Sequence, residues 1–166
     1  MTRRARKIVL LLFCAGACAS AAYSATWYVD ASCGNNGNGQ ADQCASTSGG
    51  AGAFTSLQSC VDNMNGGDTC LVKNGTYYRA GAQGYIPGFN FCVNGGRLNG
   101  TAGQYTTIKA YPGHTPKICA DASCSANPAS PAIGVFQDSG FTPSCGYVAI
   151  QGFEVSGAIE VRAPWG

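Results

Sequence analysis

The sequence predicts an all-β fold built from short strands that recur along the chain, with one short helix near its start. Charged residues make up 11% of the chain, while glycine occurs 24 times, a composition that favours short strands with frequent turns over a helical bundle. Three apolar segments repeat small or branched side chains on one face, and Val72, Ile108 and Ile150 within them are 36 and 42 residues apart. Both spacings fall in the range of repeat architectures, so we expect these three side chains to stack in one inward-facing column.

Residues 54–78 predict a helix, a glycine turn, a strand and a second turn. Thr55 followed three residues later by Gln58 is typical of a capping box, and Asn65-Gly66-Gly67 is typical of a helix end. A strand is expected over residues 69–73, before an Asn-Gly turn. The helix places its apolar residues on one face at a period of 3.6: Leu57, Cys60, Val61 and Met64.

Five motifs stand at intervals along the chain: F-T-x-L-Q-x-x-V-D at 54–62, G-D-T-x-x-V at 67–72, N-G-T-Y at 74–77, T-T-I-K-A-Y-P-G at 106–113 and Y-V-A-I-Q-G-F-E-V-S-G at 147–157. Together they resemble the N-terminal entry of right-handed parallel β-helix proteins of the pectate-lyase-like superfamily. The resemblance implies a solenoid whose first coil is plugged by the short helix and opened by the G-D-T strand. It implies no single activity, because this superfamily holds lyases, hydrolases, epimerases, adhesins and phage tailspikes.

The first 24 residues predict a signal peptide. A basic start, Arg3 to Lys7, precedes an apolar run over residues 8–17, and small residues then lead to a cleavage site after residue 24. A membrane anchor, or a lipoprotein modified at Cys14 or Cys18, are the alternatives, but the apolar run is short for a bilayer span. We therefore expect residues 25–166, the N-terminal part of a parallel β-helix domain, to be secreted to the extracellular space or the periplasm, with no stable membrane span after cleavage.

Removal of the signal peptide reverses the sign of the net charge. Four of the ten basic residues lie in it and none of the eight acidic ones, which leaves six basic against eight acidic residues, a formal charge of −2. Such a chain carries no basic patch of the kind that binds nucleic acid, so this class of partner is excluded.

The even number of cysteines in the exported part favours disulfides formed in an oxidising compartment. Zinc is the alternative, but the chain has no C-x-x-C pair and only one histidine. The pairing stays open, although Cys33 with Cys44, Cys60 with Cys70, and Cys119 with Cys124 would each close a local loop. The disulfide candidates are Cys33, Cys44, Cys60, Cys70, Cys92, Cys119, Cys124 and Cys145.

The remaining segments predict further strands and two long loops. Strands are expected over residues 26–30 and 89–93, residues 153–162 are expected to continue the repeat, and residues 31–52 and 119–145 predict loops. The chain then stops at residue 166 without a capping element. Either it is the N-terminal part of a longer β-helix protein, or another copy or a partner covers the open end by self-association.

An outward face of the expected sheet offers residues that could contact glycan: Lys73, Tyr105, Lys109 and Tyr111. Tyrosine rings stack on sugars and lysines pair with carboxylates, whereas the alternative is that the rings pack under loops and the lysines keep the sheet soluble. Tyr77, Tyr78 and Tyr85 are further aromatic candidates.

The loop over residues 31–52 and its flank raise the question of calcium. Their oxygen-bearing residues could bind the ion, but their spacing is not that of an EF-hand, and a solvated loop is the preferred interpretation. No other cofactor or metal site is expected. The oxygen-bearing residues are Asp30, Asn35, Asn36, Asn38 and Asp42.

The sequence assigns no catalytic residue. A polysaccharide lyase needs a base for the C5 proton of a uronate and a cation for its carboxylate, but His114 lies in a predicted surface turn, and neither a paired-aspartate motif nor G-x-S-x-G occurs. We expect the N-terminal portion of an extracellular polysaccharide-degrading enzyme, a lyase acting on uronate-containing glycan, with catalytic coils beyond residue 166. The alternative is a non-enzymatic surface adhesin or a self-assembling structural β-helix protein.

Overall fold

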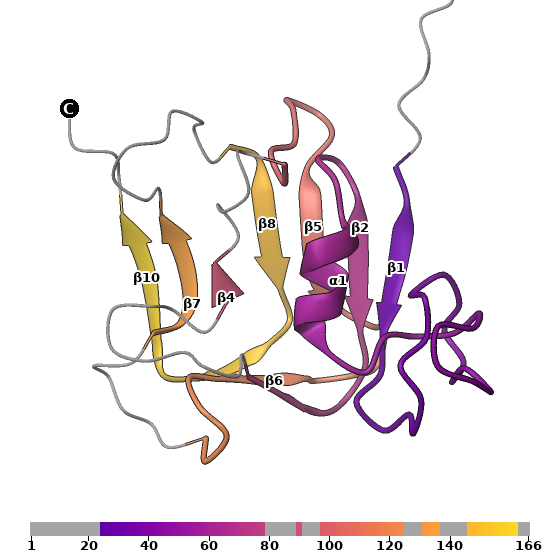
Figure 1. Ribbon diagram of the computed structural model, residues 1–166. Coiled ribbons are helices and arrows are strands. Elements are labelled where there is room, and N and C mark those ends of the chain that lie inside the picture. The colour runs from indigo at the N-terminus through magenta and orange to yellow at the C-terminus, as the bar shows by residue number, and fades with distance from the viewer. Residues whose placement is uncertain (1–23, 79–88, 91–96, 125–130, 137–145, 163–166) are drawn as a thin grey trace, which may run out of the picture.

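The computed structural model describes residues 24–78, 89–90, 97–124, 131–136 and 146–162 (Figure 1). Strands predominate over helix in these ranges, and every pairing between named strands is parallel. No helix in the described ranges is long and apolar enough to cross a membrane. The elements are β1 Thr26–Val29, α1 Leu57–Asn63, β2 Thr69–Val72, β3 Thr76–Tyr77, β4 Phe89–Asn90, β5 Thr106–Ala110, β6 Lys117–Cys119, β7 Pro131–Phe136, β8 Val148–Gln151, β9 Glu154–Ser156 and β10 Ala158–Arg162.

The strands form three sheets, which the chain visits repeatedly in the same order. The first sheet has the order β1-β2-β5-β8, the second β3-β6-β9 and the third β10-β7-β4. After β1, three consecutive strands make one round: β2-β3-β4, then β5-β6-β7, then β8-β9-β10. Each round adds one strand to each sheet beside its counterpart in the preceding round, and the other two strands of the round supply the long connection that parallel pairing requires.

The register of the first sheet corrects the predicted column of inward-facing side chains. Ile108 pairs with Ile150 on one side but with Cys70 on the other, while Val72 pairs with Ala110. The prediction that Val72 stacks on Ile108 is therefore wrong by two residues. Cys70 and Val72 face the same side, and a shift of two residues leaves every side chain on its face, so the apolar pattern cannot distinguish the two registers.

Helix α1 covers one end of the core and contacts β1 and β2 (Figure 1). Its predicted apolar face is confirmed, because each of its four side chains is at most 3% exposed. The helix begins later than the predicted capping box. Ser56 is the N-cap, and its hydroxyl oxygen accepts a hydrogen bond from the N–H of Ser59, while Thr55 donates to the side-chain oxygen of Asn36 instead.

The core lies between the three sheets and is most completely buried in the first two rounds. Val72 and Ile108 of the first sheet and Ile118 of the second are fully buried. Their counterparts in the third round, Ile150 and Val155, are only partly buried. The reason is topological: β8, β9 and β10 are each the edge strand of their sheet, so no described strand covers them.

The predicted loop over residues 119–145 is wrong in part, because it contains β7. Pro131 is the first residue of that strand, a position where the missing N–H is tolerated. The strand expected over residues 89–93 is described only as Phe89–Asn90, and the rest lies outside the described residues, as do the first 23 residues of the predicted signal peptide. The expected continuation over residues 153–162 is present as β9 and β10.

Candidate functional site

Three disulfides join cysteines that are close in sequence: Cys33–Cys44, Cys60–Cys70 and Cys119–Cys124. They are the three pairs that close local loops, and the second fastens α1 to β2. The other candidates, Cys92 and Cys145, lie outside the described residues. Several disulfides in one chain fit an extracellular protein that matures in an oxidising compartment.

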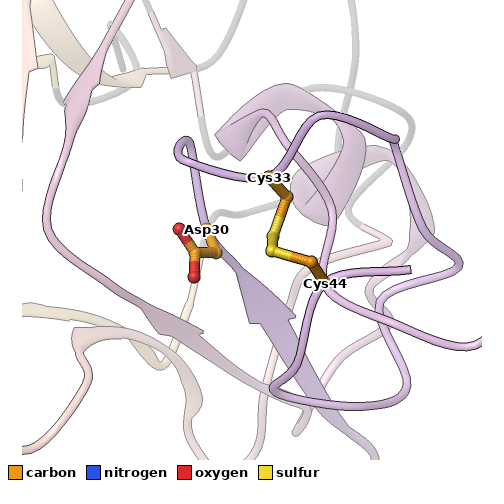
Figure 2. A group of neighbouring side chains, drawn as sticks. All are labelled: Asp30, Cys33 and Cys44. Atoms are coloured by element: carbon orange, nitrogen blue, oxygen red, sulfur yellow. A yellow bond between two sulfur atoms is a disulfide. The ribbon is translucent and has the colours of Figure 1, made fainter. Parts of the chain in front are cut away.

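Asp30, Cys33 and Cys44 form a group whose possible ligand atoms lie within 4.8 Å of one another. Figure 2 shows the two sulfur atoms bonded to each other, and the carboxylate of Asp30 points away from this disulfide. A disulfide offers no thiolate, so this group lacks the cysteine ligands of a zinc site. Burial acts to raise the pKa of Asp30, but hydrogen bonds from Ser32 and the nearby Lys73 outweigh it, and the pKa lies below its ordinary value. We interpret the group as structural: the disulfide closes the loop, and Asp30 pairs with Lys73.

Several side chains of the loop that were candidate calcium ligands form hydrogen bonds within the protein. The side-chain amide of Asn35 donates to the carbonyl of Ser46, and the side-chain oxygen of Asn38 accepts from the N–H of Gln40. A carboxylate oxygen of Asp42 accepts from the hydroxyl of Tyr111. These hydrogen bonds hold the loop together, and its interpretation as a solvated loop stays a prediction.

Lys73 and Tyr111 lie together at the carboxyl end of the first sheet, where they hold this loop. The Nζ of Lys73 is 3.3 Å from a carboxylate oxygen of Asp30, donates to the carbonyl oxygen of Asp42, and lies 5.6 Å from the centroid of the Tyr111 ring. The hydroxyl of Tyr111 donates to Asp42 over 3.1 Å, and this hydrogen bond raises the pKa of Tyr111. Two of the four residues of the predicted glycan face, Lys73 and Tyr111, are therefore already engaged by the protein.

His114 connects the turns of two successive rounds. Its Nδ1 accepts a hydrogen bond of 2.9 Å from the N–H of Asn74, whose side-chain oxygen accepts from the N–H of Thr115. The His114 ring also meets the Tyr111 ring edge to face, with centroids 5.4 Å apart. These contacts give His114 a structural role in a turn, which agrees with its sequence interpretation.

The outward side of β5 and β8 brings together two aromatic residues and a lysine. In the register of these strands Lys109 is next to Gln151, and Tyr105 and Tyr147 precede the paired residues Thr106 and Val148. The Tyr105 and Tyr147 rings lie edge to face, with centroids 5.6 Å apart, and are 51% and 47% exposed. We call this surface the tyrosine–lysine face; its residues are Tyr105, Thr107, Lys109, Tyr147 and Gln151.

Lys109 is distinguished by its lack of a protein partner. Among the basic side chains that the structure describes, Lys73 and Lys117 form ion pairs and Arg97 donates to backbone carbonyls, whereas Lys109 has neither an ion pair nor a hydrogen bond. An unpaired ammonium group on the same outward side of the sheet as exposed aromatic rings suits a ligand that carries carboxylates and stackable ring faces.

The sequence pattern reveals only part of this face. Tyr105 and Lys109 were candidates, but Tyr147 and Gln151 were missed. The signal for Tyr147 is its spacing from Tyr105, which equals the 42 residues between Ile108 and Ile150. Of the other candidate tyrosines, Tyr77 is buried at 3% exposure, Tyr78 is exposed, and Tyr85 lies outside the described residues.

Comparison of this chain with protein-family models, with curated proteins and with solved structures finds no match. The resemblance to the pectate-lyase-like superfamily therefore stays a prediction from the motifs, and a functional proposal depends on the geometry of the tyrosine–lysine face.

Proposed function

We propose that this chain is the N-terminal portion of an exported right-handed parallel β-helix protein of the pectate-lyase-like type, and that it binds a uronate-containing polysaccharide on the tyrosine–lysine face. Three rounds of parallel strands, each returning to the same three sheets, support the β-helix. Crossovers between parallel strands of one sheet are nearly always right-handed. The disulfides support export.

The observation that carries the glycan proposal is the unpaired ammonium group of Lys109. It lies on the same side of β5 as Tyr105, four residues away, which corresponds to roughly 13 Å along a strand. A polymer with a carboxylate on each sugar can stack on the tyrosines and still present a carboxylate to Lys109. A neutral polymer makes the stacking contact but leaves the lysine without a partner.

The activity that we propose for the whole protein is that of a polysaccharide lyase. In this reaction a base removes the C5 proton of a uronate, the electron pair forms the C4–C5 double bond, and the bond from C4 to the glycosidic oxygen breaks as that oxygen takes a proton from an acid or from water. Lys109 is suited to neutralise the carboxylate next to C5, which makes the proton more acidic. We assign no base among the described residues, so Lys109 is a binding residue in this proposal.

A second candidate function is a non-enzymatic adhesin or a self-assembling β-helix. The observation that favours it is the third round: among the described strands, β8, β9 and β10 are edge strands, and Ile159 in β10 is 60% exposed. Unpaired strand edges with an exposed apolar side chain are a surface on which a second copy can pair.

Binding of residues 25–166 to polygalacturonate, alginate and chondroitin, compared with a neutral galactan, tests the glycan proposal by calorimetry. Lys109→Gln should weaken binding to the acidic polymers about tenfold, the effect of one lost charge-assisted hydrogen bond. Lys117→Gln is the matched control, because Lys117 lies in the second sheet and is paired with Glu154 at 2.9 Å. Equal affinity for neutral and acidic polymers, or equal effects of the two variants, would contradict the proposal.

Absorbance from unsaturated product, measured with and without calcium, separates the two candidate functions. Product formation supports the lyase, and binding without product favours the adhesin. Filaments in electron micrographs of the purified chain favour self-assembly.

A further inference from the structure

Tyr147 has a backbone conformation that side-chain-bearing residues rarely adopt. Its φ is 56°, in the left-handed region, where an L-residue other than glycine is disfavoured by about 1–2 kcal/mol. Among the described residues, Cys124 is the other non-glycine residue with a positive φ, and its disulfide to Cys119 constrains it covalently. Tyr147 itself is not part of any disulfide.

The conformation is fixed by the surrounding backbone. The carbonyl oxygen of Tyr147 accepts a hydrogen bond of 2.9 Å from the N–H of Thr106, beside the first pair of the β5–β8 register. Just before it, the N–H of Gly146 donates to the side chain of Asn99, and its carbonyl oxygen accepts from the N–H of Gly100. A glycine at position 147 could make the same backbone hydrogen bond without the steric cost.

The side chain of Tyr147 remains partly open to solvent. The Tyr147 ring is 47% exposed, and among the described residues its ring contact is the edge-to-face pair with Tyr105, itself 51% exposed. Two rings at an interplanar angle of 85° form an open corner, in which one ring offers a face and the other an edge. Residues held in sparsely populated backbone conformations cluster at ligand sites, where the geometry serves binding.

We propose that Tyr147 is a specificity-determining residue of the glycan site: with Tyr105 it forms the corner that holds one sugar ring, while Lys109 and Gln151 bind a carboxylate and a hydroxyl of a sugar further along the same chain. This inference rests on the proposed function. Because the two subsites are roughly 13 Å apart along the strand, the preferred ligand is an acidic oligosaccharide of several units and not a single uronate.

The test compares Tyr147→Gly and Tyr147→Phe with the unmodified chain. The glycine variant should leave the midpoint of thermal unfolding nearly unchanged, because relief of the left-handed backbone offsets the greater unfolded-state entropy of glycine and the lost ring pair. The same variant should weaken binding to polygalacturonate about threefold to tenfold, because one ring of the corner is lost. Tyr147→Phe keeps the ring and should change neither quantity. Tyr78→Ala, which removes an exposed tyrosine that follows the second sheet's strand β3, is the matched control for binding.

A glycine variant that binds polygalacturonate as well as the unmodified chain overturns the inference. If the unmodified chain binds no acidic polymer, the proposed function fails and this inference with it. If Lys109→Gln loses affinity while Tyr147→Gly does not, only the inference fails. A galacturonate monomer that competes as well as a trimer at equal concentration also overturns the two-subsite arrangement.

Discussion

Asp68→Ala should destabilise the protein strongly, because this one buried carboxylate joins separate segments of the chain. Asp68 is 4% exposed, and its carboxylate accepts three hydrogen bonds: from the N–H of Ala25 at 2.8 Å, from the indole N–H of Trp27 at 3.0 Å and from the N–H of Asn65 at 2.8 Å. These donors belong to the start of β1 and to the turn after α1. The carboxylate therefore ties the first strand and the helix end to the start of β2.

The expected loss can be worked from these contacts. Hydrogen bonds to a charged group contribute about 1.5–3 kcal/mol each, and the low end applies because the contacts are only partly buried. Three lost bonds thus reduce the free energy of unfolding by about 4.5 kcal/mol, a large share of the roughly 5–15 kcal/mol of a typical domain. Asp68→Asn should cost less than the alanine variant, because an amide still accepts through one oxygen.

Urea unfolding followed by tryptophan fluorescence measures this loss. Asp62→Ala is the matched control: Asp62 is exposed on α1 and accepts one exposed hydrogen bond of 2.7 Å from Gln58, so its replacement should change stability by less than about 0.5 kcal/mol. A cost of Asp68→Ala below about 1 kcal/mol, or one no larger than that of the control, would refute the reasoning.

Three further predictions concern pH and covalent structure. The pKa of Asp30 is lowered in the folded state, so the stability that its ionised carboxylate contributes is present above about pH 4 and is lost as the pH falls through the folded pKa. The urea midpoint of Asp30→Asn should therefore decline less steeply at acid pH than that of the unmodified chain. Identical pH profiles of the two proteins would contradict the role of the ion pair. Burial raises the pKa of Tyr77 to about 12, so stability should fall as the pH rises from about 10 to 12. Tyr77→Phe should abolish that decline while costing about 1–2 kcal/mol at neutral pH, since its hydroxyl makes hydrogen bonds with two backbone groups; an unchanged alkaline profile would count against it. Replacing Cys33 and Cys44 together by serine should lower the free energy of unfolding by about 2–3 kcal/mol. It should also make the loop between them the first site of proteolysis. First cleavage elsewhere in the chain would contradict the role of this disulfide in holding the loop.

The sequence predicted those parts of the fold that local periodicity encodes. The apolar face of α1 recurs every 3.6 residues, and the alternation in β5 separates Thr106 and Ile108 from Thr107 and Lys109, as the burial of these side chains confirms. Strands β3 and β6 have two and three residues, too few for a period to be recognised. Register escaped prediction because a two-residue shift preserves every face.

The residues of the candidate site were predictable from sequence only where strand alternation alone determines which side chains point outward. Lys109 and Tyr105 follow from alternation in one strand. Tyr111, in contrast, meets Asp42 across 69 residues of sequence, and no local pattern encodes that contact. Tyr147 was missed because only the register of β5 and β8 places it next to Tyr105, and its left-handed backbone conformation is one that the sequence would indicate only with a glycine.

The disulfides have a consequence for the order of events as the chain matures. The three described bridges span 11, 10 and 5 residues, whereas Ile108 must find partners at positions 70 and 150. Closing a short loop costs less entropy than closing a long one, and it is faster. In an oxidising compartment, the disulfide between α1 and β2 can therefore form before any later round has folded. The edge of β2 in this small cross-linked unit is then available for β5 to pair with, and each later round can add to the one before it.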